Sequence, residues 1–256
     1  MGAVRFILRL PLLLLHILVG TPATVLAFYR PFRGIRVSGE PLRDVMLRWW
    51  GRTACRIFGA RVHSSGSFRD GPQLIVANHI SWLDTQLLHS LSPMGFVAKS
   101  EIESWPVAGF VARVGGTVFH RRGSHDSASG VTAAMASRLE EGGKVAIFPE
   151  GGVLPGFGVK RFHARLFAAA IDTGSPVQPV AIRYMRDGRH FKDMTFRKGE
   201  TFIANILRLL THAPLDAEVL ILEPISSFGM ARRDLALQAE IAVRDAFESG
   251  GEPEHA

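Results

Sequence analysis

Cysteine is almost absent from this chain of 256 residues, in which Cys55 is the single example. One cysteine excludes an intramolecular disulfide, so the folded part of the protein need not face an oxidising compartment. The sequence also lacks zinc-finger spacing, an aromatic RNA-recognition motif and any block rich in lysine and arginine. These absences argue against nucleic acid as a partner.

Apolar and basic side chains, in contrast, are plentiful. Hydrophobic residues make up 47% of the sequence, which is enough for one large domain with a full core. Lysines and arginines number 30 against 23 aspartates and glutamates, giving a net charge of +7. This balance indicates an anionic partner, and the apolar content favours a membrane surface or an acidic carrier protein.

The N-terminal region indicates membrane attachment. Residues Leu10–Tyr29 carry no formal charge and would be about 30 Å long as a helix, just enough to span a bilayer. Gly20-Thr21-Pro22 is expected to break that helix in the middle. A secretory signal peptide is the competing interpretation, and spanning and shallow insertion both stay open.

Positive charge is denser after this segment than before it. Arg30, Arg33 and Arg36 follow it, whereas Arg5 and Arg9 precede it. By the positive-inside rule we expect attachment to the inner, cytoplasmic membrane, with the body of the protein facing the cytoplasm.

A second stretch, Pro41–Val62, alternates aromatic and aliphatic bulk with arginines. This pattern predicts a helix in the headgroup layer of a membrane, with a surface helix packed on the domain as the alternative. We therefore divide the chain into N-terminal membrane-anchoring helices over residues 1–62, a folded domain over residues 63–250 and a disordered tail over residues 251–256.

Beyond this region short apolar runs alternate with helical patterns, which predicts an α/β fold: a layered domain with a central mostly parallel or mixed sheet flanked by helices. The expected strands are Gln73–Ala77, Gly95–Lys99, Thr117–His120, Lys144–Phe148, Val177–Tyr184 and one near Glu218–Leu222. The expected helices are Asp84–Ser90, Ser104–Val114, Ser127–Glu140, Phe162–Asp172, Thr201–Thr211 and Ala231–Glu248. The polar region Asp187–Gly199 is expected to be loop or sheet edge.

One predicted strand ends at a histidine with a nearby carboxylate. His79 follows Gln73–Ala77 closely, and Asp84 opens the next helix. An imidazole suits proton transfer near neutral pH, and a carboxylate in reach would orient it. Open α/β sheets place ligands at such strand ends. The alternative is a purely structural role, with a loop histidine beside a helix-capping aspartate.

Two further strand ends carry polar residues. Arg121 and Arg122 end the strand Thr117–His120, and arginine is well suited to gripping phosphate oxygens. The strand Lys144–Phe148 runs into Pro149, Glu150 and two glycines, which let a backbone approach a ligand closely.

At these residues the sequence resembles the lysophospholipid acyltransferase family, which includes bacterial 1-acyl-glycerol-3-phosphate acyltransferases and lyso-ornithine lipid acyltransferases. The resemblance runs from Gln73 to about Tyr184. It rests on four blocks in order: N-H-x4-D with Asn78, His79 and Asp84, G-x-x-F-x-R with Gly116, Phe119 and Arg121, F-P-E-G over Phe148–Gly151, and Q-P-V-A-I over Gln178–Ile182.

The resemblance implies an acyltransferase domain that transfers a fatty acyl group from a thioester of acyl carrier protein or coenzyme A to the free hydroxyl of a lysophospholipid. It implies His79 as the general base and Asp84 as its orienter, with neither a metal nor another cofactor. No acyl-enzyme is expected, because Cys55 lies outside the blocks and no G-x-S-x-G motif is present. Its partners would be membrane lipids and the acyl thioester. The substrate-binding residues expected are Asn78, Lys99, Gly116, Phe119, Arg121, Phe148, Pro149, Glu150 and Gly151.

One block departs from the family pattern and bears on the acceptor. In the glycerol-phosphate enzymes F-P-E-G usually continues as T-R, and that arginine helps to hold the phosphate. Here Gly152-Val153 follow, and the next cations are Lys160 and Arg161. Loss of such a contact would weaken a phosphate acceptor by roughly ten- to a hundredfold unless one of these residues replaces it. We expect 1-acyl-glycerol-3-phosphate as the acceptor, giving phosphatidic acid, with a lyso-ornithine lipid as the alternative.

Two other classes of protein are weaker interpretations. A metallohydrolase would use His79, Asp84 and Glu150 as ligands, but the blocks lack the closely spaced histidine pair typical of such sites. A non-catalytic lipid-binding protein would explain the apolar N-terminus and the basic charge, but not the four blocks.

Overall fold

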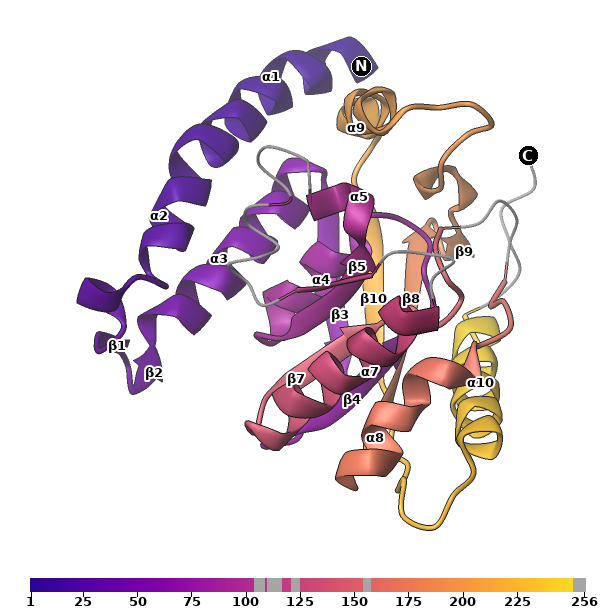
Figure 1. The fold of residues 1–256 in the computed structure, drawn as a ribbon. Helices are drawn as coiled ribbons and strands as arrows, with labels where there is room; N and C mark the ends of the chain where they lie inside the picture. Colours follow the sequence, from indigo (N-terminus) through magenta and orange to yellow (C-terminus); the bar gives the residue numbers. More distant parts are fainter. Residues whose placement is uncertain (104–108, 110–116, 121–124, 154–157, 251–256) are drawn as a thin grey trace.

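The fold is a central sheet with helices on both faces, as Figure 1 shows. This computed structural model describes residues 1–103, 109, 117–120, 125–153 and 158–250. Within them the main sheet has eight strands in the order β3-β10-β8-β4-β7-β5-β6, with β9 paired to β8. The strands are β3 (Ala60–Ser65), β4 (Gln73–Ala77), β5 (Gly95–Lys99), β6 (Val118–His120), β7 (Lys144–Ile147), β8 (Val177–Arg186), β9 (Arg189–His190) and β10 (Leu215–Ile221).

The sheet is mixed. Strands β8, β4, β7, β5 and β6 run parallel to one another, whereas β10 and β3 are parallel to each other and antiparallel to β8. The carboxyl ends of the five parallel strands therefore lie along one edge of the sheet. A separate small hairpin joins β1 (Arg36–Val37) to β2 (Glu40–Pro41).

Alternate side chains of each central strand enter different cores. Ile75 and Ala77 of β4 join a cluster with helices α3, α4 and α9, whereas Leu74 and Val76 join a cluster with α7, α8 and α10. The helices are α1 (Gly2–Leu15), α2 (Thr21–Leu26), α3 (Leu42–Ile57), α4 (Asp84–Leu91), α5 (Ser100–Glu103), α7 (His125–Glu140), α8 (Ala168–Thr173), α9 (Phe202–Thr211) and α10 (Arg232–Glu248). This arrangement of layers confirms the predicted α/β class.

Most predicted elements are present with shifted ends. Two strands, β4 and β5, have the predicted bounds, while the last strand begins earlier, at Leu215. Strand β9 lies within the region expected to be loop or edge. The predicted helix Ser104–Val114, apart from Gly109, and the predicted tail 251–256 lie outside the described residues.

The prediction of a helix break at Gly20-Thr21-Pro22 was wrong. The chain stays helical through a π-turn over His16–Gly20 and continues into α2, so that Gly2–Leu26 forms one helical segment. Proline is tolerated there because the π-turn changes the backbone hydrogen-bond pattern from i−4 to i−5 just before Pro22, which has no N–H to donate. The segment is long and apolar enough to cross a membrane, and it was the one such helix found in the described part of the chain.

The single helix predicted over Pro41–Val62 was also wrong. Helix α3 ends at Ile57, and strand β3 begins three residues later. Gly59 makes this turn with a φ of +75°, a conformation that favours glycine. Because β3 pairs with β10 in the main sheet, the boundary predicted between residues 62 and 63 falls inside a strand.

Helix α3 packs on the domain through a close approach to α4. Leu47, Ala54 and Cys55 are buried on its inner face. A Cβ on Gly51 would lie 2.7 Å from the carbonyl oxygen of Gln86, so only glycine allows this spacing. This packing corresponds to the surface-helix alternative of the sequence analysis.

The N-terminal helix is fastened to the domain and does not project from it. The guanidinium of Arg9 donates to the main-chain oxygens of Leu210 (3.1 Å) and His212 (2.8 Å), at the end of α9. Farther along, the His16 ring stacks on Trp50 of α3, with centroids 5.1 Å apart. Figure 1 shows this helical segment arching over α9 at one end and α3 at the other.

Candidate active site

The site begins at the carboxyl end of β4, where the loop after the strand carries His79. Its Nδ1 lies 2.8 Å from Oδ2 of Asp84, the first residue of α4. A carboxylate can only accept, so Nδ1 carries a proton, and in the neutral form of the ring Nε2 keeps its lone pair. The Asp84 side chain is fully buried, whereas that of His79 is 15% exposed. The arrangement thus presents a basic nitrogen that can take a proton from a bound molecule.

The carboxylate of Asp84 is held by several donors. Oδ2 also accepts the main-chain N–H groups of Ile80 (2.7 Å) and Ser81 (2.9 Å). Oδ1 accepts the hydroxyl of Tyr184 at 2.7 Å. Burial, together with the charge of Asp84, raises the pKa of Tyr184 well above its usual range, so the phenol stays a neutral donor. This contact cannot be predicted from the sequence, because it joins residues far apart in the chain.

Asn78 was expected to bind substrate, but its side chain contacts the protein. The amide donates to the main-chain oxygen of Ile182 (2.9 Å) and accepts that residue's N–H (2.7 Å). The side chain is buried, with both ends of the amide engaged by β8. Asn78 therefore fastens the loop after β4 to β8, in a positioning role.

Phe148 lies over the imidazole. Its ring stacks on His79 with centroids 3.9 Å apart and planes 10° apart, while Pro149 beside it is buried. The contact arises because β7 runs parallel to β4 as its neighbour. One face of the imidazole is therefore covered, which fixes the plane of the ring.

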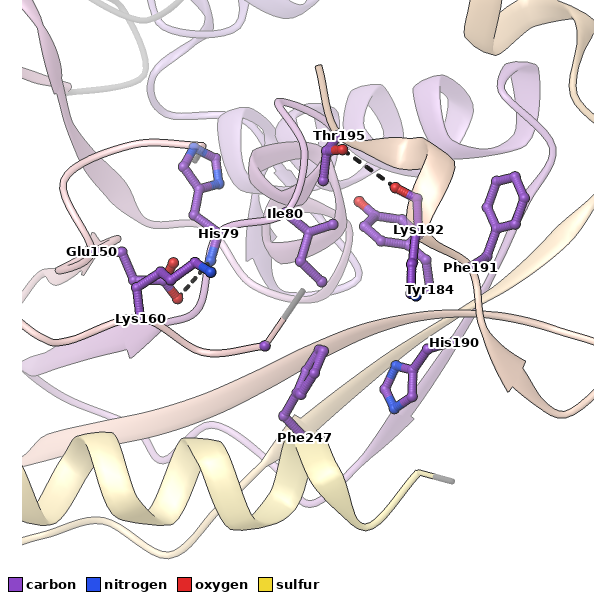
Figure 2. Close-up of a pocket in the computed structure, with 11 residues that line it drawn as sticks. His79, Ile80, Glu150, Lys160, Tyr184, His190, Phe191, Lys192, Thr195 and Phe247 are labelled. Carbon is purple, nitrogen blue, oxygen red and sulfur yellow. Dashed lines mark hydrogen bonds between the residues drawn. The ribbon is translucent and has the colours of Figure 1, made fainter. Parts of the chain in front are cut away.

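Glu150 approaches the same loop from β7. Its Oε1 accepts the main-chain N–H of His79 at 3.4 Å (Figure 2). Burial raises the pKa of Glu150 to about 7, partly opposed by main-chain N–H groups of His79 and Lys160. The carboxyl is therefore partly protonated near neutral pH. The chain turns sharply after it, with a φ of +83° at Gly151, which explains the glycine.

The remaining predicted residues lie farther along the same sheet edge or outside the described residues. Phe119 is half-buried in β6, and Lys99 ends β5 opposite His120. Of Lys99 only the backbone is described. Gly116 and Arg121 lie outside the described residues.

A cavity opens beside His79 and reaches toward β9 and the end of α10. Figure 2 shows His79 and Glu150 at one side and His190 and Phe247 at the other. The lining residues are His79, Ile80, Glu150, Gly158, Lys160, Tyr184, His190, Phe191, Lys192, Thr195 and Phe247.

Glu150 and Lys160 of this cavity were expected from the sequence, whereas His190 and Lys192 were not. Lys160 comes from the segment after β7, and Lys192 from the turn after β9. Burial, followed by the nearby charge of Arg183, lowers the pKa of His190, so that ring is neutral near pH 7. With Glu150 partly protonated, the two lysines make the cavity positive. No sequence pattern marks Lys192, because it lies in a polar region without a motif.

Two further observations concern the chemistry, one on metal ligands and one on the thiol of Cys55. In the described part of the chain no three histidine, cysteine, aspartate or glutamate side chains converge as a metal site. Burial raises the pKa of Cys55 to about 12, so this thiol is not a nucleophile at neutral pH. Among the described residues, the pair of His79 and Asp84 is therefore the group best placed to transfer a proton.

Known proteins are similar to this chain in sequence and in fold. The family described as Acyltransferase matches residues 59–183. A lyso-ornithine lipid O-acyltransferase of Pseudomonas aeruginosa is 41% identical over 204 residues, covering 80% of this chain and 79% of that protein. A 1-acyl-sn-glycerol-3-phosphate acyltransferase of Neisseria gonorrhoeae is 42% identical over 111 residues, covering 43% of this chain and 44% of that protein.

The fold also has a solved counterpart. The crystal structure of the 1-acyl-sn-glycerophosphate acyltransferase of Thermotoga maritima aligns with a TM-score of 0.75 and 23% identity, covering 97% of each chain. At this identity the likeness concerns the fold, including the N-terminal helical segment.

Proposed function

Because the chain belongs to the lysophospholipid acyltransferase family, in which its relatives are acyltransferases of lysolipids, we propose that it acylates the free hydroxyl of a lyso-ornithine lipid from an acyl thioester. The observation that carries the activity is the buried Asp84 behind His79, a residue that lines the cavity. The acceptor follows from similarity along most of the chain to the Pseudomonas enzyme, whereas the Neisseria enzyme aligns over less than half.

The reaction is a direct transfer. Nε2 of His79 takes the proton of the acceptor hydroxyl while the hydroxyl oxygen attacks the carbonyl carbon of the thioester. The new C–O bond forms, the tetrahedral intermediate expels the thiolate as the C–S bond breaks, and the imidazolium returns the proton to sulfur. Asp84 holds the tautomer and stabilises the imidazolium. Ester and free thiol are the products, and no acyl-enzyme forms.

The charges of the cavity suit an amino-acid headgroup. An ornithine headgroup offers a carboxylate and an ammonium group, and the cavity offers Lys160 and Lys192 with Glu150. A lysine can pair with the carboxylate, and binding of an ammonium group beside Glu150 would favour its ionised form. We therefore propose that the headgroup binds near Glu150 and the two lysines, while the free hydroxyl on another part of the lysolipid reaches Nε2 of His79.

A second candidate acceptor is 1-acyl-glycerol-3-phosphate. The four blocks and the Neisseria relative favour it, and the two lysines can also bind a phosphate. Against it stands Gly152-Val153, where an arginine is expected.

The membrane contact is formed by the outer side of the N-terminal segment and α9. Large exposed apolar side chains gather there: Val4, Ile7, Leu8, Leu12, Leu15, Leu18 and Val19, with Ile203 and Leu207 of α9. We call these residues the apolar surface. Because Phe6, Leu10 and Leu13 of α1 pack against the core of the domain, we propose that this helix lies on the membrane surface, at the cytoplasmic leaflet of the inner membrane. The exposed Arg30, Arg33 and Arg36 contact anionic headgroups.

The test is acylation by the purified full-length protein in detergent. Acyl carrier protein and coenzyme A thioesters are offered with either lysolipid, and His79→Ala and Asp84→Asn are run beside the exposed control Asp187→Asn. We expect acylated ornithine lipid, with the rate reduced by about 10²- to 10⁴-fold in the first two variants only. Product from 1-acyl-glycerol-3-phosphate alone would establish the second acceptor. No product from either lipid would overturn the proposal.

A further inference from the structure

We propose that Tyr184 is a positioning residue of the catalytic pair: its hydroxyl fixes the carboxylate of Asp84, and through it the imidazole of His79. The inference rests on the proposed function only in assigning proton transfer to His79. The Tyr184 hydroxyl lies 2.7 Å from Oδ1 of Asp84, and the two residues are 100 positions apart. Tyr184 comes from β8, a strand outside the loop between β4 and α4 that carries His79, which we call the catalytic loop.

The two oxygens of Asp84 have different partners. Oδ2 accepts from His79, Ile80 and Ser81, all within the loop that Asp84 itself closes. These bonds hold the loop together but do not place it on the sheet. Among the described residues, Tyr184 is the donor to Oδ1 and the one hydrogen-bond partner of this carboxylate from another element.

Strand β8 holds the Tyr184 hydroxyl in a fixed position. It lies between β4 and β10 in the sheet, and the Tyr184 side chain is 1% exposed. Two residues earlier, Ile182 exchanges two hydrogen bonds with the Asn78 amide, which sets the register between β8 and the catalytic loop. The tyrosine therefore approaches Asp84 from a frame that cannot shift without breaking these bonds.

The hydrogen bond has an electrostatic effect as well as a geometric one. A donor on Oδ1 offsets part of the negative charge that Asp84 directs at His79. Without it, the carboxylate attracts the imidazole proton more strongly, and the acid limb of the rate profile moves to higher pH. A tyrosine that only fills space would leave that limb unchanged, because phenylalanine fills nearly the same space.

The chain has two tyrosines, which allows a matched experiment. Tyr184→Phe removes the donor, and Tyr29→Phe makes the same change at a side chain that is 52% exposed. We expect the kcat of Tyr184→Phe to fall by about tenfold with KM unchanged, because the lost bond involves a charged acceptor. Its acid limb moves to higher pH, while Tyr29→Phe matches the parent in both respects.

A second probe strengthens the bond instead of removing it. In the Tyr29→Phe background, incorporation of 3-fluorotyrosine labels Tyr184 alone and makes its phenol a stronger donor. The acid limb is then expected to move to lower pH, opposite to its shift in Tyr184→Phe. An acid limb at the same pH as in the parent, both in Tyr184→Phe and in the 3-fluorotyrosine protein, would overturn the proposal. If Tyr184→Phe loses activity and melting temperature through damaged packing, an unchanged acid limb in the 3-fluorotyrosine protein would overturn it.

A measurement without substrate separates this inference from the proposed function. The ¹⁵N ring signals of labelled histidine, with His79 assigned through His79→Gln, are followed against pH in the parent and Tyr184→Phe proteins. We expect the His79 signals alone to shift their pH dependence upward in the variant. If neither lysolipid is acylated but this shift occurs, the proposed function fails and the coupling of Tyr184 to His79 stands. Identical curves would overturn the coupling.

Discussion

The rings of His79 and Phe148 lie face to face, with their centroids 3.9 Å apart and their planes 10° apart. Each ring follows the end of its own strand, β4 or β7, and these strands are neighbours in the sheet. Phe148 therefore restricts rotation of the imidazole on one face, while the hydrogen bond from Nδ1 to Asp84 fixes it at one edge.

Replacing this ring tests its contribution. Phe148→Leu keeps an apolar side chain but removes the stacked face, so we expect kcat to fall by about three- to tenfold. Little change in KM is expected, because Phe148 does not belong to the residues that line the cavity. Steady-state kinetics beside the control Phe228→Leu, at a side chain that is 90% exposed, measure the effect. Full activity of Phe148→Leu would show that Asp84 alone orients the ring.

Glu150 makes the stability of the protein depend on pH. Its pKa is raised to about 7 in the folded protein, above the usual 4.5, so folding favours the protonated form. The stability associated with this group is complete below about pH 4.5 and is lost as pH rises to about 7. Its size is on the order of 3 kcal/mol at most.

Glu150→Gln has no charge to bury and should lose this dependence. We expect the melting temperature of the variant, relative to that of the parent, to be higher at pH 8 than at pH 5. Thermal unfolding of both proteins in the same detergent at the two pH values measures the difference. A constant gap across this range would mean that the folded protein ionises Glu150 as readily as the unfolded chain does.

Gly51 is expected to be the helical glycine least tolerant of a side chain. In Gly51→Ala, the new methyl group would lie 2.7 Å from the Gln86 carbonyl oxygen and 2.8 Å from the Ser90 nitrogen, forcing α3 away from α4. We expect a loss of about 1–3 kcal/mol in the free energy of unfolding. Gly130→Ala in α7 meets no atom within 4 Å and should instead gain about 0.4–1 kcal/mol. Denaturant unfolding compares the two, and equal effects would contradict the close packing.

The apolar surface should bind the bilayer through both of its helices. Leu12→Glu in α1 and Ile203→Glu in α9 each place a charge among exposed apolar side chains, and we expect each to reduce partition onto vesicles by about tenfold or more. Co-sedimentation with vesicles containing anionic phospholipid measures the binding. Leu237→Glu is the control, because Leu237 is 54% exposed but lies on α10. A loss no greater than that of this control would place the membrane contact elsewhere.

The local parts of the fold and site could be predicted from the sequence. Buried strands such as Gln73–Ala77 are unbroken apolar runs with clear ends, and His79 and Asp84 are close enough in the chain for a short loop to join them. The parallel arrangement of β4 and β7 follows from the alternation of strands and helices. It brings Phe148 and Glu150 to the same sheet edge as His79.

The parts that depend on distant pairing could not be predicted. Tyr184 and Ile182 reach the catalytic loop only because β8 crosses back to lie beside β4, and a single sequence does not fix that register. Lys192 enters the cavity from the turn after β9, in a region without hydrophobic periodicity. The errors near the N-terminus have another cause: proline and glycine usually break helices, whereas here Gly20 lies in a π-turn that continues the helix and Pro22 follows it closely.

The bonds from Arg9 to the end of α9 have a practical consequence for making this protein. Helix α9 also carries Asn205, whose Oδ1 accepts the indole N–H of Trp82 inside the catalytic loop at 3.0 Å. Deleting residues 1–26 to obtain a water-soluble fragment would expose the side of α9 that α1 covers and remove the donor to the last carbonyl groups of that helix. Through Asn205 and Trp82, this change would reach the loop that carries His79. The apolar N-terminal segment is part of the folded structure of the enzyme. The protein must therefore be kept soluble with detergent or by substituting the outward-facing side chains of that segment.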